Sequence, residues 1–183
     1  MKRNWIKFVL GWGIVFLTQL IPGRPPNIEM ILAGQMPFAK RFGWVTGFFF
    51  GFFAVVLYSV VLGNVGPWIW ITAIAYGLLG VLAYLFFRKR RGKVKNFVVF
   101  SVFATIFYDV ITGLTIGPLV FGQTFMSALV GQIPFTLYHL MGNVAFAFIL
   151  SPMIYKWIVQ NESLEMDSIT EKIKLSYSGS YRF

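Results

Sequence analysis

The chain has 183 residues, of which 57% are apolar and only 12% are charged. Ordinary soluble domains are about 45–50% apolar and about 25% charged. The mean hydropathy is +0.72, and the chain contains 21 Phe, 8 Tyr and 6 Trp. This composition excludes a disordered chain, which needs few aromatic residues and many charges. It also argues against a soluble domain and favours an all-α protein embedded in a membrane.

The charged and metal-binding residues narrow the function further. Lys and Arg number 16 against 6 Asp and Glu, for a net charge of +10, which in a soluble protein would suggest nucleic acid as a partner. The absence of Cys excludes disulfides and thiolate metal ligands. With a single His, the sequence predicts neither a metal site nor a cofactor.

Six apolar segments follow one another along the chain, and a bilayer crossing needs about 20 residues. They cover residues 5–21, 27–39, 44–62, 67–87, 96–112 and 132–158. The second is short. The first ends in Pro22-Gly-Arg-Pro-Pro26 rather than at a small-residue cleavage site, which favours a transmembrane helix over a signal peptide. The sequence thus predicts a six-helix membrane domain over residues 1–159 and a flexible polar cytoplasmic tail over 160–183.

Residues 113–131 are also apolar, but glycines and a proline interrupt them, at Gly113, Gly117, Pro118 and Gly122. We expect a broken or re-entrant segment between the fifth and sixth spans. Elsewhere small residues recur every four positions, at Gly43, Gly47 and Gly51 and at Ala73 and Gly77. Such spacing predicts close contact between helix backbones.

The basic residues give the orientation. With the N-terminus in the cytoplasm and six spans, 15 of the 16 Lys and Arg residues fall on the cytoplasmic side, and Arg24 alone falls outside. This is the asymmetry that the positive-inside rule describes. The net charge is therefore a topology signal, and we expect a lipid bilayer rather than nucleic acid as the partner. Both termini are predicted to be cytoplasmic, in a multi-pass protein of the cell membrane.

Polar residues form stripes in the outer halves of several spans. In the sixth span Gln132, Thr136, His139 and Asn143 are four, three and four residues apart, so they share one helix face. In the fifth, a second face carries Ser101, Thr105, Tyr108 and Thr112, with Asp109 on its flank. In the fourth, Trp68, Thr72 and Tyr76 are four apart, and Asn27 and Glu29 begin the second.

These groups at a similar depth suggest a cavity that is open to the outside and binds a small organic ligand. An alternative is that they form hydrogen bonds between helices and only hold the bundle together. For a single Ser or Thr this second interpretation is favoured. For His139, Asn143, Asp109 and Glu29 the sequence leaves both open.

Three enzyme classes lack their motifs. His139-x-x-x-Asn143 resembles one element of the CAAX-type membrane proteases, but these also carry paired glutamates, and the sequence has no Glu-Glu. It has no Gly-x-Ser-x-Gly elbow for a serine nucleophile. It has no Walker A motif for ATP hydrolysis. A continuous channel is disfavoured because the polar stripes end halfway across the membrane.

Three segments resemble bacterial substrate-specific S components of energy-coupling factor transporters, and the resemblance covers residues 1 to about 159. They are Arg24-Pro-Pro-Asn-Ile-Glu29, Pro37-Phe-Ala-Lys-Arg-Phe-Gly43 and Gly131-Gln-Ile-Pro-Phe-Thr-Leu-Tyr-His-Leu-Met-Gly-Asn143. The family implies high-affinity binding of a vitamin-like micronutrient from outside. It also implies docking on a transmembrane T component with two cytoplasmic ATPases, so the chain would be a transporter subunit and not an enzyme.

The resemblance implies ligand contacts from the first loop and the outer ends of the later helices. On this chain they are Asn27, Glu29, Trp68, Thr72, Tyr76, Asp109, Gln132, His139 and Asn143. The Ala-x-x-x-Ala pattern that many family members use for docking is missing from the first helix, where Gly11 and Gly13 are two residues apart. The ligand stays open among flat vitamin-like compounds. The rival class is an accessory or scaffold membrane protein without a ligand.

Overall fold

A computed structural model describes residues 4–20, 23, 28–165, 168 and 170 of the chain. The six long helices are α1 (Trp5–Gln19), α2 (Ile31–Phe42), α3 (Trp44–Val61), α4 (Trp68–Phe87), α5 (Val94–Phe121) and α6 (Phe125–Ile154). A π-helical turn η1 (Tyr155–Val159) and a 3-10 turn η2 (Glu162–Leu164) follow. No strand occurs in these residues, so the predicted all-α class is confirmed.

Four of the helical stretches are long and apolar enough to cross a membrane: α3, α4, α5, and α6 together with η1. Helix α1 is apolar but has 15 residues, and α2 has 12. Large apolar side chains lie on the outer surface of the bundle, for example Val60, Phe103 and Phe148, which are 53–61% exposed. A surface of this kind fits lipid rather than water, and the protein is membrane-embedded.

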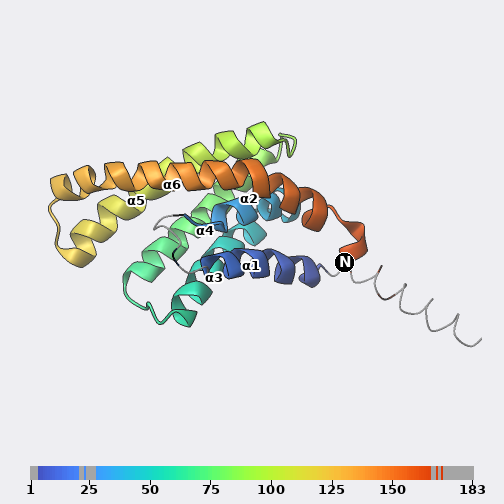
Figure 1. The fold of residues 1–183 in the computed structure, drawn as a ribbon, viewed down its shortest axis with the longest axis horizontal. Helices are drawn as coiled ribbons and strands as arrows, with labels where there is room; N and C mark the ends of the chain where they lie inside the picture. The colour runs from blue at the N-terminus through green and yellow to red at the C-terminus, as the bar shows by residue number, and fades with distance from the viewer. Residues whose placement is uncertain (1–3, 21–22, 24–27, 166–167, 169, 171–183) are drawn as a thin grey trace, which may run out of the picture.

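The helices run back and forth between two ends of the bundle, which lie toward the left and right of Figure 1. At one end Lys7 Nζ donates to Val159 O at 3.1 Å, and Lys40 Nζ donates to Arg90 O at 2.6 Å. Partial burial there lowers the pKa of the Lys40 ammonium. We call this the basic end. The opposite end holds the α3–α4 turn (residues 62–67) and the α5–α6 turn (residues 122–124), and we call it the far end.

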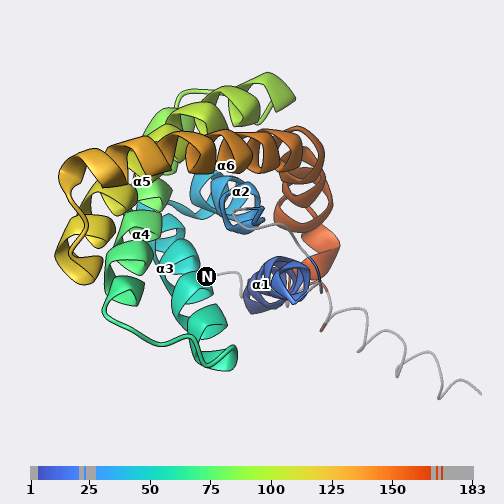
Figure 2. The ribbon, with the colours of Figure 1, turned by 60° about the vertical axis from the view of Figure 1, so that its left-hand side comes forward.

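Helix α2 is the centre of the bundle (Figure 2). All of residues 31–39 are buried, against α3, α4 and α6. Twelve residues span about 18 Å, whereas a bilayer core is about 30 Å thick. The N-terminus of α2, with Glu29 just before it, therefore lies beside the middle of the longer helices.

Glycines let α3 and α4 approach closely. A Cβ atom on Gly47 would lie 2.6 Å from the carbonyl oxygen of Gly80. Buried Gln35 of α2 donates to Gly47 O at 2.9 Å and to Tyr76 O at 2.6 Å. Gly43 lies between α2 and α3, and its φ of 97° is a backbone conformation that favours glycine. Gly43 therefore forms the turn between the two helices, whereas Gly47 allows a close helix contact. The predicted close helix contact is confirmed at Gly47.

Of the interruptions expected within residues 113–131, those at Gly113, Gly117 and Pro118 are wrong, and the one at Gly122 is confirmed. Helix α5 continues through Gly113, Gly117 and Pro118 and ends at Gly122, whose φ is 65°. Thr124 then caps α6 by accepting from Ser127 N at 3.2 Å. Glycine lowers helix propensity without preventing a helix, and the antiparallel partner helix offsets the cost. The result is a hairpin of 28 and 30 residues, whose turn is at the left in Figure 1.

The start of the predicted tail packs against the bundle. Glu165 is buried, and its Oε1 lies 3.4 Å from Lys7 Nζ on α1. Residues 166–167, 169 and 171–183 lie outside the described part of the chain.

Candidate functional site

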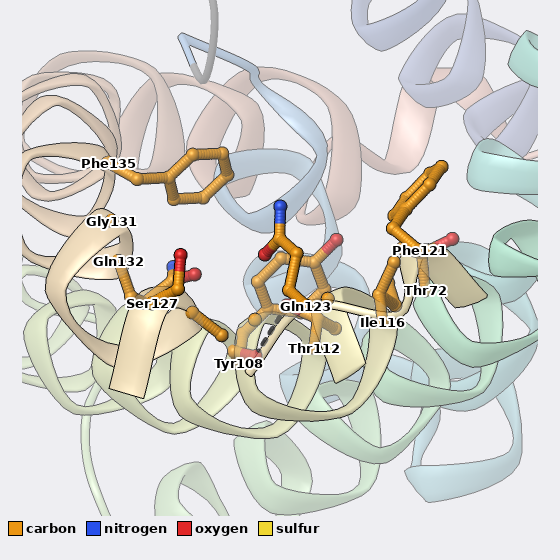
Figure 3. A pocket seen from close by; sticks show the side chains of 13 residues that line it. Thr72, Tyr108, Thr112, Ile116, Phe121, Gln123, Ser127, Gly131, Gln132 and Phe135 are labelled. Carbon is orange, nitrogen blue, oxygen red and sulfur yellow. Dashed lines mark hydrogen bonds between the residues drawn. The ribbon is translucent and has the colours of Figure 1, made fainter. Parts of the chain in front are cut away.

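A cavity of about 460 Å³ opens at the far end between α4, α5 and α6. Its wall combines rings with hydrogen-bonding groups, including Tyr108, Phe121, Phe135, Thr72 and Gln132. Figure 3 shows Phe121 and Phe135 on opposite sides of the hollow. The size and the mixed lining are typical of a small-molecule site.

A layer of buried polar side chains lies one helical turn below the cavity. Thr72 and Phe135 line the cavity, and Tyr76 and His139 follow them at four residues' distance on α4 and α6. Tyr108 joins the two layers, because it lines the cavity and its ring lies 4.6 Å from that of Tyr76 and 5.6 Å from that of His139.

The buried layer is built around two carboxylates and one imidazole. His139 Nδ1 lies 2.7 Å from Asp109 Oδ1, and His139 Nε2 lies 3.5 Å from Glu29 Oε1. The Tyr76 hydroxyl donates to Glu29 Oε1 at 2.6 Å, and Gln19 Nε2 donates to Glu29 Oε2 at 3.4 Å. This layer connects α1, α4, α5, α6 and the segment before α2. We call it the polar cluster.

Helices α5 and α6 face each other as an antiparallel ladder of polar pairs. Asp109 pairs with His139, and one turn deeper Asn143 Nδ2 donates to Thr105 Oγ1 at 2.9 Å. Two oxygens of this ladder, Asp109 Oδ2 and Asn143 Oδ1, are buried without a hydrogen-bond partner among the described residues. A buried polar atom left unpaired costs about 1–3 kcal/mol, so a further group that bonded to these two oxygens would be stabilising.

Below the ladder the bundle is closed. Phe87, Phe97 and Phe100 are almost fully buried there, and the Phe87 and Phe97 rings lie 5.0 Å apart. The cavity and the polar cluster therefore form a cup that ends inside the bundle, not a pore lined along its whole length.

The structure brings most of the predicted site residues together. Thr72 and Gln132 line the cavity, and five others form the polar cluster and the ladder: Glu29, Tyr76, Asp109, His139 and Asn143. Trp68 lies at the rim, stacked 5.9 Å from the ring of Phe121. Asn27 and Arg24 lie outside the described residues.

Several residues of the site were not among the predicted contacts. Tyr108, Thr105 and Thr112 were recognised as a polar face of the fifth span, but they were not assigned to the ligand. Phe121, Gln123 and Phe135 gave no signal, since a ring or an amide beside apolar residues looks like ordinary packing. Only the folding of α5 against α6 brings them to one cavity.

The hydroxyl groups behave differently from the cluster. Ser101, Thr105 and Thr112 each donate to a carbonyl of their own helix at 2.7–2.8 Å. These hydroxyl donors are therefore satisfied within their own helix, and not by the bonds between helices that the alternative interpretation expected. Among the described residues no group of three or more His, Asp or Glu side chains has the arrangement to hold a metal ion.

The fold and the site define an all-α membrane protein with a cup at one end of its bundle. The chain matches no protein-family model, and no curated protein is similar to it.

Proposed function

We propose that this chain is the substrate-binding S component of an energy-coupling factor transporter. It binds a vitamin-like micronutrient in the far-end cavity with high affinity, and it delivers the compound across the membrane. One observation carries the proposal: a cavity of about 460 Å³ lies directly above a buried polar cluster, and the bundle is closed beneath both.

The orientation follows from the charges. The basic end faces the cytoplasm of a cell membrane, all six helices cross or enter the bilayer, and both termini are cytoplasmic. The cavity then faces outside. Ten Lys and Arg residues of the described chain support this orientation, since all belong to the basic end: Lys7, Lys40, Arg41, Arg88, Lys89, Arg90, Arg91, Lys93, Lys95 and Lys156.

Delivery needs partners. The sequence holds no Walker A motif, so the chain does not hydrolyse ATP by that route. In the proposed assembly a transmembrane T component and two cytoplasmic ATPases supply the energy to release the ligand inside. The chain itself binds the ligand and carries it, and it does not catalyse a reaction.

Purified protein tests the binding step. Mass spectrometry of the compound released on denaturation is expected to find one small organic molecule in a fixed ratio to protein. The variants His139→Ala and Asn143→Ala are expected to lose most of it, because both remove side chains of the ladder. Asn96→Ala is a matched control, since Asn96 bonds Arg91 O at the basic end. Unchanged ligand in both ladder variants would contradict the assignment.

An accessory membrane protein without a ligand is the second candidate. It is favoured by the pairs that the polar residues form within the bundle, such as Asn143 with Thr105. Affinity purification from the native host separates the two: recovery of ATPase subunits supports transport, and recovery of other membrane proteins with no released compound supports the accessory role.

A further inference from the structure

The two unpartnered oxygens beneath the cavity have the same chemistry. Asp109 Oδ2 and Asn143 Oδ1 both accept hydrogen bonds, and neither donates as a carboxylate or amide oxygen. The residues are 0% and 2% exposed and lie on facing helices, in adjoining pairs of the ladder. A group that hydrogen-bonds to these two oxygens must supply the donors.

The surrounding helices have no Lys or Arg beside these oxygens to supply donors. Helices α4 and α6 contain no Lys or Arg, and α5 contains only Lys95, in its first turn at the basic end. His139 Nδ1 is directed to the other oxygen of Asp109. Glu29 adds a second carboxylate, 3.5 Å from His139 Nε2. Among the described residues the layer thus offers acceptors and negative charge.

Two residues that line the cavity are also close to the ladder. Tyr108 is the residue before Asp109 and lines the cavity. Phe135 also lines the cavity, one turn from His139, and the centroids of the two rings lie 6.0 Å apart. The tyrosine and phenylalanine rings both line the cavity and contact the His139 imidazole, whose Nδ1 lies 2.7 Å from Asp109 Oδ1. A flat group bound against the Tyr108 and Phe135 rings would keep aromatic contact on its faces beside the ladder.

From this arrangement we infer that the substrate carries a planar cationic group with several N–H donors, of the amidinium or guanidinium kind. Asp109 and Asn143 bind that group. The inference rests on the proposed function and names the chemistry of its substrate. Carboxylate and donor-bearing cation form short charge-assisted hydrogen bonds, and in a membrane interior such pairing is what makes a buried charge tolerable.

Three aromatic probes of nearly the same shape test the inference on the full chain in lipid nanodiscs: benzamidine, benzamide and benzoate, which are cationic, neutral and anionic. Binding at millimolar concentration is followed by saturation-transfer NMR. We expect benzamidine to bind at least about tenfold more tightly than benzamide, and benzoate to be rejected.

Two variants tie the preference to the site. Asp109→Asn keeps the size of the side chain and removes its charge, so the preference for benzamidine over benzamide is expected to fall about tenfold. Glu162→Gln removes one carboxylate at the basic end and is expected to leave the preference unchanged. Gel filtration and circular dichroism confirm that each variant is folded.

Equal binding of the three probes, no binding of benzamidine, or a preference that survives Asp109→Asn would overturn the inference. The compound released from the native protein separates this failure from that of the proposed function. A neutral or anionic released compound would contradict the inference that the substrate is cationic, and it would leave the transporter proposal standing. Absence of any released compound, together with absence of ATPase partners, overturns both.

Discussion

Single polar residues inside a bilayer are costly unless they are paired, and the polar cluster shows how this chain pairs them. Asp109 is fully buried, and its partner His139 comes from the facing helix. Glu29 is held from α4 by Tyr76 and from α1 by Gln19. Each pair joins two elements, so these residues fix the helices around the cavity.

The Tyr76 hydroxyl provides a test at this scale. Tyr76→Phe removes the 2.6 Å hydrogen bond to Glu29 and keeps the ring that packs on Tyr108. We expect it to lower the free energy of unfolding by about 1–3 kcal/mol, because a charged acceptor loses a buried donor. Unfolding in a denaturing detergent measures the change.

The matched control is Tyr84→Phe in the same helix, whose hydroxyl has no hydrogen-bond partner in the described part of the chain. It is expected to change stability by less than about 0.5 kcal/mol. A loss as large in Tyr84→Phe as in Tyr76→Phe would show that the ring environment, not the bond to Glu29, sets the cost.

Periodicity predicted the residues of the site better than it predicted its boundary. Gln132, His139 and Asn143 stand out because polar residues at helical spacing are rare in an apolar span. Tyr108 and Phe135 did not stand out as contacts, since an aromatic ring has the same appearance in a packed core and in a cavity wall. Their role depends on the contact of α5 with α6, and the residue pattern within one helix does not show which helix packs against it.

At the scale of elements, the α5–α6 hairpin is where prediction from the sequence failed. Glycine and proline at residues 113–122 indicated a broken segment, but a long helix holds all of them until Gly122. Local propensity is weak beside packing against a second long helix. Three other spans were predicted well, since α1, α3 and α4 differ from the expected ranges by no more than two residues at either end. Helix α2 starts four residues and ends three residues after its expected range of 27–39.

The α3–α4 contact gives a prediction for an element. In Gly47→Val the new Cβ would lie 2.6 Å from Gly80 O and 2.7 Å from the Ala39 Cβ. Backbone cannot yield as a side chain does, so α3 must move away from α4, and we expect stability to fall by about 1–3 kcal/mol or more. Thermal unfolding in detergent checks this.

Gly13→Ala is the control for that change, because nothing lies within 4 Å of a Cβ placed there. It is expected to be neutral or slightly stabilising, as alanine is the better helix former by about 1 kcal/mol. If Gly47→Val were as stable as Gly13→Ala, the close approach of α3 and α4 would be wrong.

At the scale of the whole molecule, the two ends of the bundle are chemically opposite. The described Lys and Arg residues gather at one end, where Lys7 and Lys40 donate to backbone carbonyls. The cavity lies at the far end, and the polar cluster lies beneath it, beside the middle of the longer helices. A bundle with this polarity can receive a ligand from one side of a membrane and contact soluble partners on the other.

The absence of cysteine makes this polarity directly testable, because a single introduced thiol is the only one in the chain. Val65 lies in the α3–α4 turn at the far end and is 65% exposed, and Lys89 is exposed in the α4–α5 turn at the basic end. In intact cells a membrane-impermeant maleimide is expected to label Val65→Cys at once. It is expected to label Lys89→Cys only after the membrane is opened, as the positive-inside rule requires. The reverse pattern would turn the cavity toward the cytoplasm and exclude uptake from outside, whereas labelling of both sites in intact cells would mean that the two turns share one side and that α4 does not cross the bilayer.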